Sequence, residues 1–577
     1  MNAIVAGNDR SDQRPSLLSD IKSGFMVFLI ALPLCLGIAK ASECPPIAGI
    51  YTAIAGGVIA TLLSNSQLTI KGPAAGLIVI VMGCVLQFRE QLEGAGVENA
   101  ALEAYRMMLA VCVVSGVIQI LLGFFKSGVL GQFFPSSAVH GLLASIGVII
   151  MAKQLPVALG VPASILKDSH NHPLEPLPLI LKLPTAILQF NPSIAVIGIV
   201  GLVIMFGLPA FLPKIPKLVP SQLIVLVVAV ILATFLLHVP APGAPDYDYS
   251  LFGKEYKLSA ESHLVNVPTN VLQEVSGRAT GLAQLNFFPN FAALKTGIAW
   301  KWVALFAIIG SLESLLSSKA VDMLDPQKRK TDLNRDLLAV GAANTVVAFF
   351  GGIPMISEIV RSRANIDNGA QSKYSNLFHG LFLLLAVVAI PAVLNRIPLA
   401  ALASMLIFTG FRLAHPREFM HVYHIGREQF VVFVSTIIGV LATDLLIGIM
   451  IGIAVKLGIH FINGVPLMSI FRPFLNIEQV DDSTYRILAS KSAIFSNWLL
   501  FRRQIYLYGL TENKNIIVDL SETQLVDHTV LENLHELQQD FADKKLSLTI
   551  VGLEHHVALT DHPESTRVRS VSRKVGA

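Results

Sequence analysis

The stretch GGIPMISEIVRS, residues 351–362, places two glycines and a proline directly before a short helical pattern in an otherwise apolar region. A second stretch, TIKGPAAGLIVIV at residues 69–81, has the same character in the first half of the chain. In both, a glycine–proline break precedes a helical run too short to cross a bilayer. Interrupted segments at corresponding positions in two halves of a membrane protein indicate a binding site within the membrane. These two stretches therefore predict both the fold and the place of the site.

The bulk composition supports a membrane-embedded chain. Of the 577 residues, 53% are hydrophobic and only 14% are charged, and the mean hydropathy is +0.64. Soluble domains carry about 25% charged residues. The small net charge of +4 and the lack of a basic block argue against a nucleic-acid partner. The sequence has no nucleotide-binding loop, no nucleophile–base pattern and no metal cluster, so we do not expect an enzyme.

Hydrophobic segments of the length that spans a bilayer recur along the chain. We count fourteen, which begin near residues 23, 46, 73, 105, 138, 192 and 220 and near residues 299, 336, 355, 375, 398, 428 and 444. Seven plus seven predicts an internal repeat, and an odd number of spans per unit requires the second copy to be inverted. The predicted fold is an α-helical polytopic membrane protein with a 7+7 inverted repeat and a small cytoplasmic α/β domain.

The predicted domain boundaries follow from the same pattern. They are an N-terminal cytoplasmic segment (1–22), a transmembrane domain (23–465), an α/β domain (466–565) and a tail (566–577). Within the transmembrane domain, repeat 1 covers about 23–239, an outward loop 240–296 and repeat 2 297–465. Basic residues cluster at span ends that share one side, which predicts cytoplasmic termini in a bacterial-type inner membrane. A signal peptide is the alternative for the first segment, but Pro33 interrupts it.

The two broken segments predict an anion site. A helix that starts in mid-membrane leaves its first backbone N–H groups unpaired, and its dipole places partial positive charge there. Two such ends can bind a small anion without a full buried cation. The residues at these ends are Ala74, Ala75, Gly76 and Leu77 in the first stretch, and Ser357, Glu358, Ile359 and Val360 in the second. The alternative is that both breaks are ordinary kinks.

An acidic residue lies near the middle of the predicted eighth span. Glu313 is costly there, so it is a functional candidate. We expect it to bind a coupling ion, either a proton or Na⁺, the latter together with the hydroxyls of Ser314 and Ser317. A structural hydrogen bond to a neighbouring helix is the alternative. Arg361 could complement an anion or reach the cytoplasmic interface, as we expect of Arg363.

These residues resemble the SulP (sulfate permease, solute carrier 26) family of anion transporters. The resemblance rests on ALPLCLGIA and PPIAGIYTA in the first two spans, KGPAAG in the third, GSLESLLSSKAVD in the eighth, and KRKTDLNRDLLAVGAANTV before and within the ninth. It also rests on GGIPMISEIVRSRANIDNGAQSKYSN around the tenth span. The segment IIVDLSETQLVDHTVLENL is similar to the core of a STAS domain.

The resemblance implies core and gate domains, an elevator-like movement of the core and a homodimer. Carried over by position, it implies an anion site made by Leu34 and Ile38, residues 74–77, Glu313 with Ser317, and residues 357–361. Two positions depart from the family pattern. Family members often have a Thr where Ala74 stands, and Glu358 occupies a place usually held by a small residue. Two carboxylates beside an anion favour proton or Na⁺ linkage, and a Glu358–Arg361 salt bridge is the competing explanation.

In soluble STAS relatives the loop before the helix carries a phosphorylatable serine. Here the loop reads Asp527-His528-Thr529-Val530, so Thr529 is a weak candidate for regulation. A helix N-cap role for Asp527 or Thr529 is the alternative. A cytoplasmic protein partner of the STAS-like domain is a further expectation.

We therefore expect a secondary transporter of small inorganic anions, with bicarbonate and sulfate as leading substrates. It would need no cofactor other than Na⁺ or H⁺ as coupling ion, and its partners would be the anion, membrane lipid and a second copy of the chain. The alternatives are an anion channel or exchanger without cation coupling, or a nucleobase or dicarboxylate permease of the same fold.

Overall fold

The computed structural model describes residues 16–128, 134–167, 174–215, 219–236, 247–251, 254–258, 263–267, 274–275, 278–279 and 287–569. The chain forms two compact units. The first contains residues 1–128 and 150–410, and the second contains residues 129–149 and 411–577. The predicted domain boundaries remain predictions, because compactness is a different criterion from the sequence pattern.

Each of the fourteen predicted segments coincides with a helix. The first seven are α1 (Leu17–Ala41), α2 (Pro46–Ala55) with its continuation Gly56–Ala60 and α3 (Thr61–Leu63), α4 (Ile78–Gly94), α5 (Ala100–Phe124), α6 (Ser136–Leu159), α8 (Pro192–Phe211) and α10 (Ser221–Leu236). The second seven are α12 (Gly297–Leu324), α13 (Leu333–Phe349), α14 (Ile359–Asp367), α15 (Tyr374–Ala389), α17 (Leu399–Leu413), α19 (Arg427–Ala442) and α20 (Leu445–Ile462). Eight helices in the described part of the chain are long and apolar enough to cross a membrane.

The structure adds elements that the hydropathy pattern does not predict. They are the apolar helix α7 (Pro176–Ile187), the short α16 (Pro391–Leu394), α18 (Pro416–Ile425) and the 3₁₀ turns Ala163–Leu166 and Phe291–Lys295. The predicted outward loop contains the hairpins β2 (Tyr247–Leu251) with β3 (Lys254–Leu258) and β4 (Glu274–Val275) with β5 (Arg278–Ala279). Much of that loop lies outside the described residues.

Two short strands stand at the centre of the first unit. β1 (Ile70–Pro73) pairs antiparallel with β6 (Met355–Glu358), and the register joins Ile70 to Glu358 and Pro73 to Met355. Helix α4 follows β1 and helix α14 follows β6. Because the strands are antiparallel, the two helices leave the ladder in opposite directions. Four paired residues span about 10 Å, so both helix N-termini lie close to this ladder.

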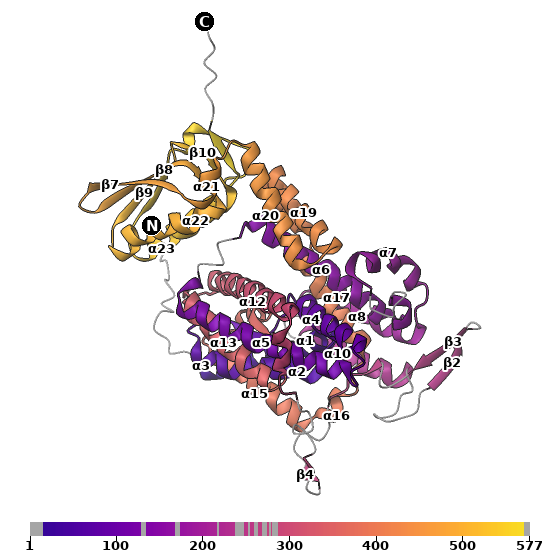
Figure 1. Ribbon diagram of the computed structural model, residues 1–577. Coiled ribbons are helices and arrows are strands. Elements are labelled where there is room, and N and C mark those ends of the chain that lie inside the picture. The colour runs from indigo at the N-terminus through magenta and orange to yellow at the C-terminus, as the bar shows by residue number, and fades with distance from the viewer. Residues whose placement is uncertain are drawn as a thin grey trace. The chain divides into compact units, whose positions relative to one another are not determined.

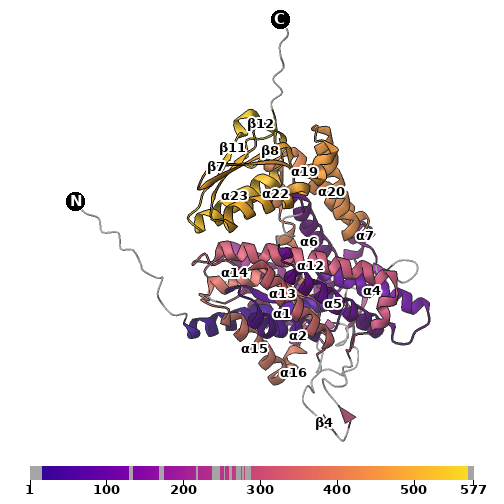
Figure 2. The ribbon, with the colours of Figure 1, turned by 60° about the vertical axis from the view of Figure 1, so that its left-hand side comes forward.

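Small residues let the surrounding helices approach. α5 and α13 lie side by side in both views (Figures 1 and 2). A side chain at Gly116 of α5 would meet the backbone carbonyl oxygen of Gly341 at 2.9 Å, and one at Gly341 would meet that of Gly116 at 2.8 Å. Close backbone contact through glycine is typical of helix pairs in membranes.

The C-terminal domain of the second unit is an α/β fold. Its sheet has the order β11-β9-β8-β10-β13-β12, with β7 paired to β8. The elements are α21 (Leu467–Phe471), β7 (Phe474–Asp481), β8 (Thr484–Ala493), α22 (Trp498–Ile505) with its continuation Tyr506–Thr511, β9 (Asn515–Asp519), β10 (Thr523–Val526), α23 (His528–Asp543), β11 (Leu548–Val551), β12 (His556–Ala558) and β13 (Arg567–Arg569). Strand β13 extends the sheet into the segment predicted as a tail.

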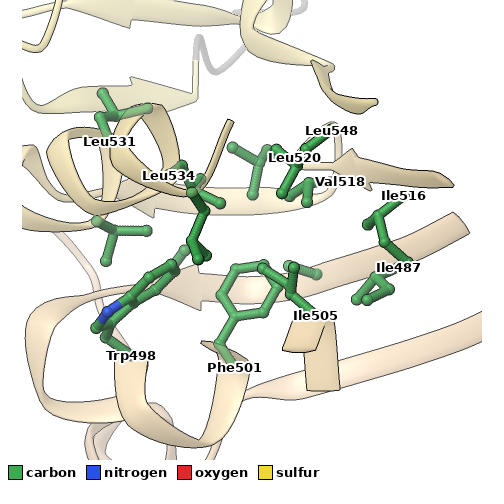
Figure 3. Packing of buried hydrophobic residues seen from close by; sticks show 14 of the residues in the cluster. Ile487, Trp498, Phe501, Ile505, Ile516, Val518, Leu520, Leu531, Leu534 and Leu548 are labelled. Atoms are coloured by element: carbon green, nitrogen blue, oxygen red, sulfur yellow. The ribbon is translucent and has the colours of Figure 1, made fainter. Parts of the chain in front are cut away.

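The core of this domain lies between the sheet and two helices. Figure 3 shows Trp498 and Phe501 of α22 and Leu531 and Leu534 of α23 packed with strand residues such as Val518. The helical spacing predicted a shared apolar face for four residues of α23, and all four are buried: Val530, Leu531, Leu534 and Leu537.

Candidate functional site

The carboxylate of Glu313 lies against the start of α4. A Cβ atom built on Gly76 would stand 2.0 Å from Oε1 of Glu313, so only glycine leaves room for this side chain. Oε2 of Glu313 is buried and has no hydrogen-bond partner among the described residues. The alternative of a structural hydrogen bond to a neighbouring helix therefore leaves this oxygen unexplained. A buried carboxylate oxygen is costly unless a proton, a cation or a water satisfies it.

A second carboxylate stands at the same place. Glu358 is the last residue of β6. The backbone N–H of Ala75, two residues before the N-cap of α4, interacts with the Glu358 carboxylate. Its Oε1 is also buried without a partner in the described part of the chain. The competing explanation is a salt bridge to Arg361. Within the described residues the two side chains are not within ion-pair distance, although the charge of Arg361 attracts that of Glu358, and Arg361 donates to Pro73 instead.

Arg361 is buried and holds the ladder to helix α1. It is 1% exposed, and its Nη2 donates to the carbonyl oxygen of Pro73 at 3.2 Å. Its Nη1 lies 3.6 Å from Sγ of Cys35 in α1 and against Gly72, where a side chain would displace it. Arg361 therefore does not reach the interface. Arg363 is exposed and pairs with Asp367 at 3.0 Å. Its position at the membrane interface stays a prediction.

A buried polar network lies behind the ladder. Lys71 of β1 donates to Asp336 of α13 at 2.6 Å and to the hydroxyl of Ser357 at 2.8 Å. The backbone N–H of Ser357 donates to Oγ of Ser314 at 3.1 Å. Ser314 and Ser357, both predicted at the site, thus position β6. A direct role toward an ion or anion would require them to leave these bonds.

Sequence reasoning missed three residues that hold the ladder. Lys71 and Asp336 appeared in quoted motifs, but their spacing gave no sign that they pair. Asn344 of α13 accepts from the N–H of Met355 at 2.7 Å and donates to its carbonyl oxygen at 3.1 Å. The signal available was the presence of three polar side chains inside apolar segments, which are costly unless they are paired.

The other residues predicted at the site differ in how deeply their side chains are buried. Leu34, Ile38, Ala74 and Leu77 are buried, with 8%, 3%, 1% and 1% exposure. Ala75, Val360 and Ser317 are half-buried, and the side chain of Ile359 is exposed. The structure therefore brings the start of α4, Glu313 and Glu358 together, whereas Ile359 faces away from them.

A cavity of about 1050 Å³ lies beside α4 and α1 in the first unit. Its lining includes Gly37 and Lys40 of α1 and Met82 and Leu86 of α4. Elsewhere along α1, Ile30 and Leu34 pack in one apolar cluster with residues of α8, α10 and α17, such as Met405. One part of the boundary between these helix groups is thus open and another is filled with side chains.

The loop predicted as a regulatory site is buried against membrane helices of the second unit. Thr529 is 1% exposed, and its Oγ accepts from the N–H of Ser136 in α6 at 3.4 Å. Asp527 occupies the N-cap position of α23 but makes no side-chain cap bond. It pairs with Lys456 of α20 at 2.7 Å instead. Phosphorylation of Thr529 stays a prediction, and it would require this contact to open.

Comparisons with known proteins show which proteins this chain is similar to. Residues 17–436 match the Sulfate permease family. A putative sulfate transporter, YvdB of Bacillus subtilis, is 26% identical over 75% of this chain and 72% of its own. The bicarbonate transporter BicA of Picosynechococcus is 22% identical over 76% of this chain and 69% of its own.

Solved structures show the same fold. The transmembrane domain of a cyanobacterial BicA matches 76% of this chain and 97% of its own with a TM-score of 0.55 at 20% identity. The overall structure of SLC26A9 matches 93% of this chain and 84% of its own with a TM-score of 0.60 at 16% identity.

Proposed function

Because the chain belongs to the sulfate permease family, we propose that it is a secondary active transporter of bicarbonate or sulfate coupled to Na⁺ or H⁺. The observation that carries the proposal is the carboxylate of Glu313 against Gly76, at the N-terminal end of α4. An electropositive helix end and an unpartnered acid at one point can bind an anion and a cation together.

Charge balance supports coupling. An anion at the end of α4 would face Glu313 and Glu358, and both have a buried oxygen without a partner among the described residues. The buried guanidinium of Arg361 offsets part of the charge of Glu358, but Glu313 still repels an anion unless a proton or a cation neutralises it. A proton or Na⁺ on Glu313, with Ser317 one turn further along α12, would supply that charge. The anion and the cation would then bind as a unit.

The two parts of the boundary described above support a mechanism of alternating access. The cavity beside Lys40 gives solute a path from one side, and the packing of Ile30 and Leu34 closes the other. We propose that the helices carrying the ladder move as a rigid body past α8, α10 and α17, in the manner of an elevator. This movement would open the second path and close the first.

The orientation and assembly are part of the same proposal. The basic span ends place both termini in the cytoplasm of a bacterial-type inner membrane. The cavity then opens outward, because the C-terminal end of α1 lies on the outer side. We also propose a homodimer and a cytoplasmic partner for the C-terminal domain. Both proposals rest on the resemblance to the family.

Uptake into liposomes tests the proposal. Purified protein should accumulate ³⁵S-sulfate or ¹⁴C-bicarbonate when an inward Na⁺ or proton gradient is imposed. Glu313→Gln should abolish the response to the gradient, because the amide cannot carry the coupling charge. Uptake that ignores every cation gradient in the wild-type protein, or anion current that persists without one, would refute coupling and favour a channel or exchanger.

A glycine substitution tests the geometry of the site. Gly76→Ala should lower uptake by roughly 100-fold, because the new methyl group displaces the Glu313 carboxylate. Gly94→Ala, at the last residue of α4, is the control, since nothing lies within 4 Å of its Cβ position. Equal uptake by the two variants would contradict the placement of Glu313.

A further inference from the structure

The cavity beside α4 has a charged wall that the proposed mechanism does not use. Four basic side chains line it, and they outnumber the two acidic ones. The basic residues are Lys40, Arg89, Lys153 and Lys167, and the acidic residues are Glu43 and Glu255. Amide side chains of Gln154, Gln189 and Asn191 add donors to the same wall. Such a lining attracts anions, and it lies outside the site at the ladder.

Lys153 of α6 is the basic residue whose surroundings point to a missing partner. Its ammonium donates to Sδ of Met82 at 3.1 Å, and no carboxylate in the described part of the chain lies within ion-pair distance of it. A thioether is a weak acceptor, and an ammonium carries three donors. Glu43 acts on Lys153 only from a greater distance, and it is itself exposed.

Arg89 and Lys40 differ from Lys153 in this respect, and Lys167 has an interaction of its own. Arg89 pairs with Glu93 at 2.7 Å, so its charge is already balanced locally. Lys40 is exposed at the last turn of α1, where it can also interact with the helix dipole. Lys153 is partly buried between α6 and α4, where a charge without a counter-ion is costly. An anion in the cavity would remove that cost.

The Met82 contact places Lys153 near the ladder end of α4. Met82 lies four residues after Ile78, where α4 begins, which is about 6 Å along the helix axis. An anion held by Lys153 would therefore stand roughly one helical turn from the end of α4. The proposed transfer from Lys153 to the ladder would cover this distance along α4.

We infer that Lys153 forms an access site that binds a small oxyanion in the cavity before it passes to the ladder. The inference rests on the proposed function. Met82 lies on α4, which would move with the ladder in the proposed mechanism, so the site would exist only while the cavity is open on this side. It would concentrate substrate at the outer face and play no part at the inner face.

Sided transport kinetics test the inference. Right-side-out and inside-out membrane vesicles would take up ³⁵S-sulfate or ¹⁴C-bicarbonate at a series of concentrations, with gluconate as the inert salt. Lys153→Gln should raise KM about tenfold in right-side-out vesicles and leave Vmax and the inside-out KM within twofold. Lys153→Arg should restore most of the affinity. The increase should shrink at high ionic strength.

Lys40→Gln is the matched control, because it removes the same charge from an exposed position of the same cavity. It should change KM less than Lys153→Gln does. A KM change that is equal in the two vesicle preparations, or a fall in Vmax alone, would overturn the access site in favour of a structural role. Wild-type vesicles that take up neither anion would instead refute the proposed function.

Discussion

Two lysine–aspartate pairs are buried in this protein, and they differ in what surrounds them. Lys71 and Asp336 approach to 2.6 Å behind the strand ladder, and both are 1% exposed. Lys456 and Asp527 approach to 2.7 Å where the C-terminal domain meets α20, with 1% and 0% exposure. By distance and burial alone the two pairs look the same.

The first pair is set in a complete hydrogen-bond network. Asp336 accepts from Lys71 and from three serine hydroxyls, those of Ser64, Ser318 and Ser357, at 2.5, 2.7 and 3.1 Å. In the second pair, neither carboxylate oxygen of Asp527 has a well-directed hydrogen bond within the described ranges. Oδ1 of Asp527 lies within ion-pair distance of the Lys456 ammonium. It also lies 3.7 Å from Nε2 of His460, which carries a charge only when the ring is protonated.

The comparison distinguishes an ion pair that fixes the ladder from one that holds the C-terminal domain to a membrane helix. We call the second pair, Lys456–Asp527, the latch. A buried ion pair offsets the cost of desolvation only when further hydrogen bonds satisfy both groups. The Lys71–Asp336 pair meets this condition and joins β1 to α13, so it fixes the ladder. The Lys456–Asp527 pair depends mainly on charge and joins a membrane helix to the N-terminus of α23. We expect the first to be rigid and the second to be separable.

The largest effect is expected for Lys71→Met. The change leaves Asp336 charged, buried and without its cation, which costs about 3–5 kcal/mol of stability. Thermal unfolding in detergent should show the loss, and uptake should fall with it because β1 carries the start of α4. The double variant Lys71→Met with Asp336→Leu should recover most of the stability. If the double variant did not recover stability, the pair would have a role beyond the neutralisation of the two charges.

Lys456→Met should cost less, about 2–3 kcal/mol, although the charge removed is the same. The second pair is the separable one, so the contact with α20 can open and let water reach Asp527 once the lysine is lost. Asp527 also occupies the N-cap position of α23, where the helix dipole stabilises its carboxylate. With Trp300 and Trp302 changed to Phe, the fluorescence of Trp498 reports on the C-terminal domain alone, since the chain has three tryptophans. A loss as large as that of Lys71→Met would erase the distinction between the pairs.

The helices were predictable because the backbone hydrogen bonds of a helix form within the segment itself, and its apolar residues are visible as a run in the local sequence. All fourteen predicted segments are helices, and the two interrupted ones contain the paired strands. Helix α18 was missed because its polar residues hide its periodicity, and α7 because three prolines, Pro176, Pro178 and Pro184, obscure it. Both carry enough apolar surface to be buried on one side.

The ion pairs were not predictable for a physical reason. Lys71 and Asp336 lie 265 positions apart in the sequence. Nothing in the sequence around either residue indicates that the two side chains pair. The Glu358–Arg361 salt bridge was the pairing that local spacing suggested, and it does not form. Arg361 turns instead to the carbonyl oxygen of Pro73, a contact that exists only after β1 and β6 have paired.

A smaller effect should appear when one hydroxyl of the network is removed. Ser318→Ala takes away a donor to Oδ2 of Asp336 and should cost about 1 kcal/mol in thermal unfolding. Ser311 provides the control on the same helix, because its hydroxyl is buried without a partner among the described residues. Ser311→Ala should be nearly neutral. If both variants were neutral, the serine network would not explain why the first pair is the more rigid.

The smallest effect is expected from pH, and only at the second pair. Burial raises the pKa of Asp527, but the charges of Lys456 and His460 outweigh burial and hold that pKa well below its usual range. A depressed pKa stabilises the folded form above the unfolded value of about 3.9 and loses that contribution as pH falls below it. The stability difference between wild type and Asp527→Asn, measured by Trp498 fluorescence, should stay constant from pH 7 to 5. It should then shrink below about pH 4. A difference that already disappears between pH 7 and 5 would show that the latch depends on the protonation of His460 and not on Asp527.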